Sequence, residues 1–466
     1  MSSTGEALRV AVVGAGPAGF YATLELIANP EVQAHVDMFD RLPTPYGLVR
    51  FGVAPDHQRI KTVTNMYERG VEAAGDRFHL FGNVQLGTDI TLDELLARYH
   101  AVILTYGAQS DRQLGVPGEN LPGVVAAREF VAWYNGHPDY HDAAFTLSGE
   151  RAVVVGIGNV AIDVARILMR TPSELAQTDI APYAAEALSR GGFQEVVILA
   201  RRGPLQSKCT PVELRELTQM EEADLVVAER DLALDPIAEQ LIEAGEVDRQ
   251  SLKNLEVLKG ALHEPRPGRK VIRLRFFASP VAFEGTSRVE GLRVVRNELK
   301  RTDIGYVTVA PTGEEELIGC DAVFRAIGYM VTSVPGVPYD EVRHTIPHDH
   351  GQVLEGPGTA AVPGLFVAGW AKRGPTGIIG TNKPDAAETV ATLMAAWRGG
   401  TLPAPTAGDV VDLLQARGVR YVTYEDWKLL DQLETEAGSR EGRPRVKFTD
   451  VADMLEALAD ATEGAA

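Results

Sequence analysis

The stretch that decides the fold is Arg9-Val-Ala-Val-Val-Gly14-Ala-Gly16-Pro-Ala-Gly19, near the start of the chain. Its first five residues are mostly apolar and predict a buried strand, and the apolar pattern of residues 20–27 predicts a helix. A second strand is expected at 36–39, and it ends at Asp40. Strand, glycine turn, helix, strand and acidic residue together predict a βαβ unit that binds a dinucleotide.

Each glycine of this motif has a separate physical task. Gly14 permits the tight turn, Gly16 lets the backbone approach a pyrophosphate, and Gly19 lets helix and strand pack closely. The phosphates then lie at a helix N-terminus, where free N–H groups and the helix dipole favour negative charge. Asp40 can accept hydrogen bonds from ribose hydroxyls and would repel a phosphate at that position, so a ribose without a 2′-phosphate is expected here.

The same design returns in the middle of the chain with a different ending. A strand at 152–155 leads into Gly156-Ile157-Gly158-Asn159-Val160-Ala161, and a helix is expected at 162–169. The next recognisable strand, 195–200, ends in Arg201-Arg202 instead of an acid. Two guanidinium groups can hold a ribose 2′-phosphate through charge-assisted hydrogen bonds. The second motif therefore indicates NADP(H).

Two sites with opposite ribose chemistry predict two different dinucleotides. FAD at the first motif and NADPH at the second is the simplest assignment, and it implies hydride transfer from the nicotinamide to flavin N5. The glycine-rich stretch 374–380 suits a backbone that approaches a flat ring closely. A helix that starts near Ile378 would direct N–H groups at the flavin, and Trp370 offers an aromatic surface near the ring.

Composition limits the remaining possibilities. The chain has 466 residues, of which 45% are hydrophobic, so several folded domains are expected. No apolar run approaches the roughly 20 residues of a membrane span, and the first residues lack an apolar signal core, so no membrane insertion is expected. The net charge of −19 argues against nucleic-acid binding. Only two cysteines are present, Cys209 and Cys320, which excludes a Cys-x-x-Cys pair, a four-thiolate metal site and an iron–sulfur ligand set. The cytoplasm is the expected compartment.

The order of the motifs predicts the domain arrangement. Further buried strands are expected at 101–105, 321–328 and 364–369, and a helix at about 385–397. The alternating pattern between about 270 and 310, which includes Val271 to Phe276, predicts antiparallel strands. From about residue 405 the chain reads as an acidic, helical C-terminal tail with a polar loop at 438–445.

The predicted fold class is thus α/β, with two Rossmann-like dinucleotide-binding domains of which the second is inserted into the first. Each domain has a parallel sheet plus small antiparallel strands. Residues 1–108 and 333–466 are expected to form the FAD-binding domain, and 109–332 the NADP(H)-binding domain. Nothing in the sequence requires more than a monomer.

Several longer stretches resemble one known family. Residues 40–57 read Asp-Arg-Leu-Pro-Thr-Pro-Tyr-Gly-Leu-Val-Arg-Phe-Gly-Val-Ala-Pro-Asp-His, which is similar to the FAD-domain signature of the adrenodoxin reductase type of NADPH–ferredoxin reductase. Residues 156–163, 200–204, 369–382 and the tail motif Gly-Arg-Pro-Arg at 442–445 share the resemblance. It extends over nearly the whole chain.

The resemblance implies a set of binding residues. Those expected at FAD are Gly14, Ala15, Gly16, Ala18, Gly19, Asp40, Gly47, Leu48, Val84, Gly369, Trp370, Gly377, Ile378 and Ile379. Those expected at NADP(H) are Gly156, Ile157, Gly158, Asn159, Val160, Arg201, Arg202, Glu213 and Gly377. The resemblance also implies that His57 and Glu213 lie close together near the flavin, as the candidate catalytic residues, where we expect them to tune nicotinamide access and electron transfer.

The resemblance also implies an electron acceptor, a ferredoxin, which is a small acidic iron–sulfur protein. We expect it to dock on a local basic patch, with Lys208, Arg215 and the segment 251–301 as candidates. That segment carries 12 Lys and Arg against 5 acids. Two alternatives remain open: an NADPH diaphorase that reduces free flavin or quinones, and a non-enzymatic NADPH sensor whose FAD is structural.

Overall fold

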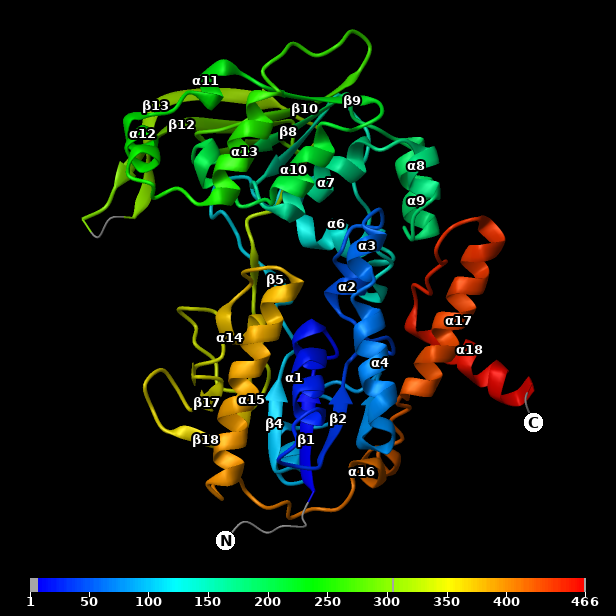
Figure 1. The fold of residues 1–466 in the computed structure, drawn as a ribbon. Helices are drawn as coiled ribbons and strands as arrows, with labels where there is room; N and C mark the ends of the chain where they lie inside the picture. Colours follow the sequence, from blue (N-terminus) through cyan, green and yellow to red (C-terminus); the bar gives the residue numbers. More distant parts are fainter. Residues whose placement is uncertain (1–6, 304–305, 465–466) are drawn as a thin grey trace.

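The chain folds into two lobes that are stacked end to end, with a long helical tail along one side (Figure 1). The computed structural model describes residues 7–303 and 306–464. The lower lobe in Figure 1 contains both ends of the chain, and the upper lobe contains the middle of it. This is the arrangement expected for one dinucleotide-binding unit inserted into another.

The lower lobe is built on a seven-stranded sheet in the order β16-β17-β18-β4-β1-β2-β3. The strands β18, β4, β1, β2 and β3 are parallel, and β16 and β17 form the small antiparallel edge. The strands are β1 (Leu8–Val13), β2 (Ala34–Phe39), β3 (Phe78–Phe81), β4 (Ala101–Leu104), β16 (His348–Asp349), β17 (Gln352–Leu354) and β18 (Ala361–Val367). The helices of this lobe are α1 (Pro17–Ile27), α2 (Leu48–Phe51), α3 (Gln58–Lys61), α4 (Thr64–Ala74), α5 (Leu92–Leu96), α14 (Trp370–Arg373) and α15 (Asn382–Arg398). Apolar cores lie on both faces of the sheet.

The upper lobe has a six-stranded, fully parallel sheet in the order β6-β14-β7-β8-β10-β9. Its strands are β6 (Val124–Ala126), β7 (Arg151–Val155), β8 (Glu195–Leu199), β9 (Ala223–Val227), β10 (Lys270–Arg275) and β14 (Ala322–Arg325). A separate antiparallel sheet contains β11 (Ala278–Glu284), β12 (Gly291–Arg301) and β13 (Val307–Gly319). The helices are α6 (Ala127–Tyr134), α7 (Asn159–Met169), α8 (Pro172–Ala176), α9 (Pro182–Arg190), α10 (Pro211–Leu217), α11 (Glu229–Leu232), α12 (Pro236–Glu243) and α13 (Arg249–Lys259).

One predicted strand pairing is wrong. The alternating pattern predicts an antiparallel pair at residues 271–276, but β10 lies inside the parallel sheet between β8 and β9. Its sequence alternates because one face packs on the core through Ile272 and Leu274, while the other face is charged. Arg273 on that face donates to Glu195, and Arg275 pairs with Asp231, so the charges are neutralised in the protein. Only β11 to β13 form the expected antiparallel sheet.

The chain passes between the lobes at two points that lie side by side. β5 (Ser110–Asp111) on the way up pairs antiparallel with β15 (Tyr329–Met330) on the way down. This two-stranded link lies beside the predicted boundaries at 108/109 and 332/333.

The tail consists of α16 (Val410–Ala416), α17 (Tyr424–Glu441) and α18 (Val451–Gly464). Trp427 and Leu430 of α17 are buried in the core of the lower lobe. The predicted loop at 438–445 begins later than expected, because α17 continues to Glu441 and ends at Gly442 in a left-handed cap. No described helix has both the length and the apolar character needed to cross a membrane.

Candidate nucleotide-binding sites between the lobes

The first glycine motif forms an open cradle at the carboxyl end of β1. Gly14 has φ +114°, and a Cβ at this position would lie 2.6 Å from the carbonyl carbon of Thr105. A Cβ on Gly19 would overlap the carbonyl oxygen of Gly14, so only glycine lets α1 approach the strand this closely. Gly16, in contrast, faces open space, since a Cβ there would meet no other atom within 4 Å. The first turn of α1 has neither a side-chain cap nor an acidic residue, which leaves this end suited to phosphate.

Two other predicted FAD segments meet this cradle. A Cβ on Gly47, which has φ +47°, would lie 3.1 Å from the Cα of Gly16. A Cβ on Gly369, which has φ +75°, would lie 2.5 Å from the Cβ of Ala18. The structure therefore brings residues 14–19, 47 and 369 into close contact, although they are far apart in the sequence.

Asp40 lies beside the same turn, and its carboxylate also binds two backbone N–H groups, which the sequence does not predict. Its Oδ2 accepts from the N–H of Ala15 at 2.8 Å, and its Oδ1 accepts from the N–H of Leu42 at 3.0 Å. The N–H of Val84 donates to its backbone carbonyl. Burial raises the pKa of Asp40, while the two backbone donors act to lower it. Each carboxylate oxygen retains a lone pair for a ribose hydroxyl.

The residues predicted to lie at the flavin ring provide apolar surface. Leu48 and Ile378 are 37% and 60% exposed. The indole N–H of Trp370 donates to the carbonyl of Thr376, and the indole ring lies 5.5 Å from the ring of Tyr329. Ile379 begins a short turn, Ile379–Thr381, that leads directly into α15. A flat aromatic ring fits such a surface.

The second glycine motif has the same geometry in the upper lobe. Gly156 has φ +130°, and a Cβ there would overlap the carbonyl oxygen of Ala326. Gly158 faces open space, and α7 begins after it without a side-chain cap. Ala161, in the place of the third glycine, is fully buried against the sheet. This cradle also suits a pyrophosphate.

Arg201 and Arg202 follow β8 at the expected place for ribose recognition. Among the described residues neither guanidinium has a carboxylate partner. Burial and the neighbouring charge of Arg201 lower the pKa of Arg202. Two adjacent cations without an internal counter-ion form a site for a doubly charged anion such as a phosphate ester.

Glu213, a buried carboxylate next to this cradle, has a hydrogen-bond donor at only one of its two oxygens. The side-chain amide of Asn159 donates to Oε1 of Glu213 at 3.3 Å and accepts from the N–H of Thr210 at 2.8 Å. Oε2 of Glu213 is buried and has no hydrogen-bond partner. A buried oxygen without a donor destabilises the folded protein unless a ligand supplies the donor. The geometry therefore fits a nucleotide bound between Gly158 and α10.

His57 has a different carboxylate partner from the expected one. Its Nε2 lies 2.7 Å from Oε2 of Glu216, three residues after Glu213 on α10. No contact joins His57 to Glu213 among the described residues; Glu213 instead holds Asn159. The sequence does not single out Glu216, and only the i, i+3 spacing on a short helix could have suggested it.

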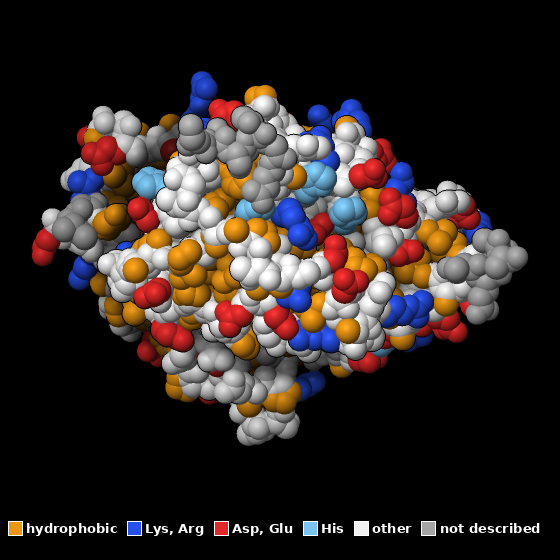
Figure 2. All heavy atoms as spheres, turned by 90° about the horizontal axis from the view of Figure 1, so that it is seen from below, with side chains coloured by type: hydrophobic (Ala, Val, Ile, Leu, Met, Phe, Trp, Pro, Cys, Tyr) orange, Lys and Arg blue, Asp and Glu red, His pale blue; other side chains and the backbone are white. Residues whose placement is uncertain are grey.

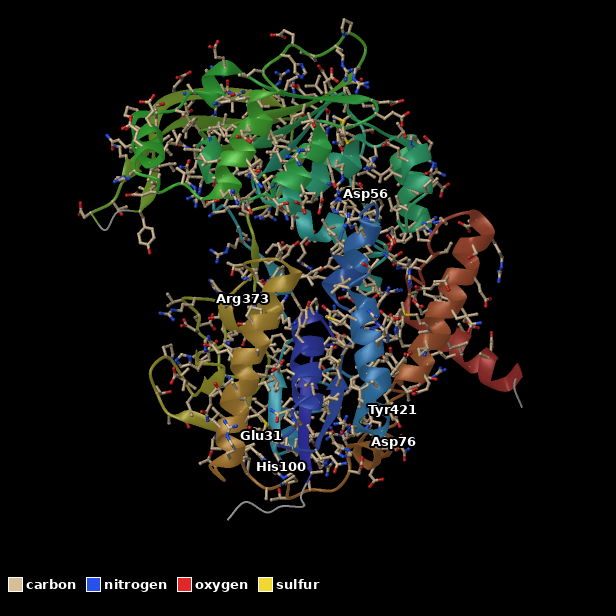
Figure 3. All side chains as sticks on the ribbon, in the orientation of Figure 1. Glu31, Asp56, Asp76, His100, Arg373 and Tyr421 are labelled. Atoms are coloured by element: carbon tan, nitrogen blue, oxygen red, sulfur yellow. The ribbon has the colours of Figure 1, made fainter. Side chains whose placement is uncertain are left out.

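The pair between His57 and Glu216 belongs to a buried charge cluster that joins the lobes. Arg166 of α7 is fully buried and contacts Glu216 at 2.9 Å, Asp163 at 2.8 Å and Asp56 at 2.7 Å. Asp56 lies at the end of the lower lobe that faces the upper one (Figure 3). The cluster therefore holds His57 at the boundary between the two lobes.

The charges of this cluster shift two pKa values. Burial lowers the pKa of His57, but the hydrogen bond to Glu216 and the charges of Asp163 and Asp56 raise it, and the net result is a raised pKa. Burial raises the pKa of Asp163 to about 6, against the lowering effect of Arg166. Asp163 therefore titrates closer to neutrality than most carboxylates do.

Of the two cysteines, Cys209 lies beside the second cradle, where its backbone N–H donates to the carbonyl of Ile157. Cys209 and Cys320 are both buried and free. Burial raises the pKa of each thiol to about 12, so neither is a reactive thiolate at neutral pH.

The predicted basic segment is largely neutralised within the upper lobe. Eight of the twelve cations in residues 251–301 have a carboxylate partner: Arg266, Arg269, Arg273, Arg275, Arg293, Arg296, Lys300 and Arg301. Lys208 and Arg215 are exposed and have no ion pair among the described residues. These two remain the better candidates for a docking patch.

Two glycine turns, one in each lobe, with an acid after β2 and two arginines after β8, are typical of oxidoreductases that bind two nucleotides. In agreement, the family model described as pyridine nucleotide-disulphide oxidoreductase matches residues 8–225. The chain is 44% identical over 458 residues to an NADPH-ferredoxin reductase, FprA, of Mycobacterium tuberculosis, and the match covers 96% of this chain and 98% of that relative. It is 39% identical over 471 residues to a mitochondrial NADPH:adrenodoxin oxidoreductase of Arabidopsis thaliana, covering 98% and 97% of the two chains.

A solved structure agrees with these relatives. The M. tuberculosis FprA in complex with NADPH matches with a TM-score of 0.91 at 43% identity and covers 97% of this chain and all of that one. The chain therefore belongs to the FprA and adrenodoxin reductase family of NADPH–ferredoxin reductases. The resemblance expected from residues 40–57 and 369–382 is confirmed.

Proposed function

We propose that this chain is a flavoenzyme that carries electrons from NADPH through FAD to a ferredoxin-type iron–sulfur protein. FAD is held by the lower lobe, residues 1–108 and 333–466, and NADP(H) by the upper lobe, residues 109–332. The observation that carries the assignment is the contrast at the two ribose positions. A half-buried carboxylate, Asp40, follows β2, whereas two cations without an ion pair, Arg201 and Arg202, follow β8 in the part of the chain that the structure describes.

The residues of the chain bind and orient the two nucleotides. Gly14 to Gly19 and Gly156 to Val160 offer backbone N–H groups to the two pyrophosphates, and Oε2 of Glu213 accepts a donor from NADPH. FAD, when bound, supplies the chemistry: it takes a hydride from NADPH and releases the two electrons one at a time. Trp370 and Gly377 line the space where the nicotinamide meets the flavin.

His57 and Glu216 act at the boundary between the lobes rather than as an acid–base pair, because hydride transfer itself moves no separate proton. Their hydrogen bond joins α10, which carries Glu213, to the segment that follows the FAD-binding residues 47 and 48. We infer that this bond sets how the nicotinamide enters the site.

The acceptor is an acidic protein that docks beside the gap between the lobes. Lys208 and Arg215 on the upper lobe provide exposed positive charge without an ion pair among the described residues, and α13, which packs on α10, adds Lys253. The opposite end of the lower lobe carries interspersed acidic and basic side chains (Figure 2), so it offers no comparable site. Because the net charge is −19, this local patch must overcome long-range repulsion.

Anaerobic mixing of the purified, FAD-loaded chain with NADPH tests the proposal. Bleaching of the flavin absorbance, followed by its return when ferredoxin from the same cell is added, is the expected result. No bleaching would identify an NADPH sensor with structural FAD. Reoxidation by quinones or free flavin but not by ferredoxin would identify a diaphorase.

The docking site is tested by charge reversal. Lys208→Glu combined with Arg215→Glu should raise the KM for ferredoxin and leave flavin bleaching by NADPH unchanged. Activity of the unmodified chain with ferredoxin should fall as salt rises, since screening weakens the attraction. Salt-independent activity would refute electrostatic docking.

We also infer that the chain acts as a monomer in the cytoplasm. The two free cysteines suit a reducing compartment. Sedimentation at several concentrations tests the oligomeric state.

A further inference from the structure

The loop between α17 and α18, residues 442–450, contacts both lobes through the buried side-chain amino group of Lys447; we call it the tail loop. Burial lowers the pKa of Lys447 well below the usual lysine range. Nζ of Lys447 donates to the carbonyl of Arg50 at 3.2 Å and to the carbonyl of Asn135 at 3.1 Å. It also lies 3.3 Å from Oδ2 of Asp179. Arg50 belongs to the lower lobe, whereas Asn135 and Asp179 belong to the upper lobe, so Lys447 connects both.

Asp179 receives a second cation from the lower lobe. Nζ of Lys61 donates to both of its carboxylate oxygens at 2.7 Å. The side chains of Lys447 and Asp179 are only 1% and 2% exposed. A contact that is shielded from water in this way is weakened little by salt. Loss of Lys447 would leave Asp179 with Lys61 alone, and the contact of Asp179 with the tail loop through Lys447 would be lost.

The tail loop is held in place by α17. A Cβ on Gly438 would lie 2.6 Å from the backbone nitrogen of Arg445, so glycine is required for the loop to fold back on the helix. The buried carboxylate of Glu434 accepts from Arg445 at 3.1 Å and from the N–H of Phe448 at 2.8 Å. These contacts present Lys447 to the upper lobe in one fixed position.

Arg443 forms a second contact between the tail loop and the upper lobe. Its Nε donates to the carbonyl of Thr178 at 3.0 Å, and its Nη2 donates to the carbonyl of Ile180. These two carbonyls flank Asp179, which pairs with Lys447. Arg443 and Lys447 therefore both bind the same short segment of the upper lobe, residues 178–180.

The tail loop contacts the upper lobe at some distance from the two-stranded link through which the chain passes between the lobes. The link formed by β5 and β15 lies near the middle of the gap between the lobes, whereas the upper end of α17 reaches the upper lobe near α9, at the side (Figure 1). The covalent link has only two residues in each strand, and the charge cluster around Arg166 and Asp56 also joins the lobes. The tail loop adds a further attachment at the side, which restricts rotation of one lobe against the other.

We propose that Lys447 is a positioning residue that fixes the angle between the lobes and so sets the approach of the nicotinamide to the flavin. The proposal rests on the proposed function, since hydride transfer requires the reacting atoms to lie within about 3–3.5 Å. A displacement of about 1 Å can slow such a step roughly 100-fold. Lys447 touches neither nucleotide site, so its loss should change the geometry of the reaction and not the affinity for NADP⁺.

Lys447→Met is the variant that tests this, because methionine keeps most of the unbranched side chain and removes the amino group. The matched control is Lys428→Met, since Lys428 is an exposed lysine of α17 whose partner, Glu72, lies in the lower lobe only. Each chain is loaded with FAD. Three quantities are measured: amide hydrogen exchange of residues 131–141 without NADPH, NADP⁺ affinity from the flavin difference spectrum, and the anaerobic single-turnover rate of flavin reduction by NADPH.

The expected result is faster exchange at residues 131–141 and flavin reduction slowed at least tenfold in Lys447→Met, with NADP⁺ affinity unchanged. Lys428→Met should match the original chain in all three. Wild-type exchange and wild-type reduction in Lys447→Met would overturn the proposal, and so would a loss of NADP⁺ affinity with an unchanged reduction rate.

A second variant decides the question if Lys447→Met does not fold. Arg443→Met keeps Lys447 but removes the bonds to residues 178 and 180, and it should produce the same changes to a smaller extent. Wild-type behaviour of Arg443→Met in that case would overturn the proposal. If NADPH fails to bleach the flavin of the original chain, the proposed function fails, but the exchange measurement still tests the attachment of the lobes.

Discussion

The coenzyme preference is the prediction that tests the two-site argument most directly. Arg201 and Arg202 follow β8, where a dinucleotide presents its adenosine ribose. Replacing both with alanine removes the two cations and leaves the glycine cradle at 156–161 unchanged. The double variant should therefore weaken NADPH, which has a 2′-phosphate, and leave NADH binding within a few fold of its original value.

The size of the effect follows from the surroundings of the two side chains. A hydrogen bond to a charged group contributes about 1.5–3 kcal/mol. Arg201 is exposed and belongs at the low end of this range, whereas Arg202 is half-buried and belongs nearer the high end. Together the two arginines contribute about 3–5 kcal/mol to the free energy of NADPH binding. Their loss should raise the dissociation constant of NADPH by roughly two to four orders of magnitude. Because the two cations repel each other, the single substitutions should sum to a value different from that of the double variant.

Anaerobic titration with each coenzyme, followed by the flavin spectrum, measures the preference. Arg190→Ala is the matched control, because Arg190 is an exposed arginine of the same lobe that pairs with Glu186 on its own helix. The ratio of the NADPH and NADH dissociation constants should change only in the Arg201 and Arg202 variants. An equal loss of affinity for both coenzymes would refute the assignment of the 2′-phosphate site.

Three further substitutions test other parts of the structure. Glu216→Gln removes the charge that raises the pKa of His57, so the imidazole should lose its proton at a lower pH, as followed by nuclear magnetic resonance of the ring. Gly19→Ala places a Cβ against a backbone oxygen of the phosphate loop, so the purified protein should contain less than half of the normal flavin, as read from its absorbance. Glu434→Gln breaks the buried pair with Arg50 and should lower the free energy of unfolding by about 3–5 kcal/mol, as measured by denaturant titration.

Each of these substitutions has a control at an exposed position. Glu222→Gln should leave the titration of the histidine unchanged, Gly408→Ala should retain full flavin, and Glu436→Gln should alter stability by less than about 0.5 kcal/mol. An unshifted histidine in Glu216→Gln would show that the bond between His57 and Glu216 does not set its pKa. Full flavin in Gly19→Ala, or unchanged stability in Glu434→Gln, would contradict the geometry of the loop or of the buried pair.

The stretch at residues 40–57 shows how far sequence reasoning reaches and where it ends. Its motif identifies the family, but its physical role is visible only in the fold. Asp56 pairs with Arg166 and His57 with Glu216 across the boundary between the lobes, whereas Arg50 pairs with Glu434 of α17 within the lower lobe. The partners lie 110, 159 and 384 residues away along the chain, and no local pattern specifies contacts at such separations.

The sequence also does not decide whether Glu213 or Glu216 pairs with His57. Both are acidic residues on one short helix, and the sequence alone offers no reason to favour either as the partner of His57. Which one reaches His57 depends on the rotation of α10 relative to the lower lobe. That rotation is set by packing on α7 and α13, and it leaves Glu213 free to hold Asn159.

The sequence by itself determined the two glycine turns, the acid that follows β2 and the arginines that follow β8, because each depends on local backbone freedom and on the next charged residues in the chain. The tertiary structure alone decided that β10 is parallel, that Glu216 meets His57, and that Lys447 bridges the lobes. These features depend on which segments, distant in the sequence, pack together in the folded protein. A buried charge without a partner destabilises the fold, and the partners of these charged groups come from such distant segments.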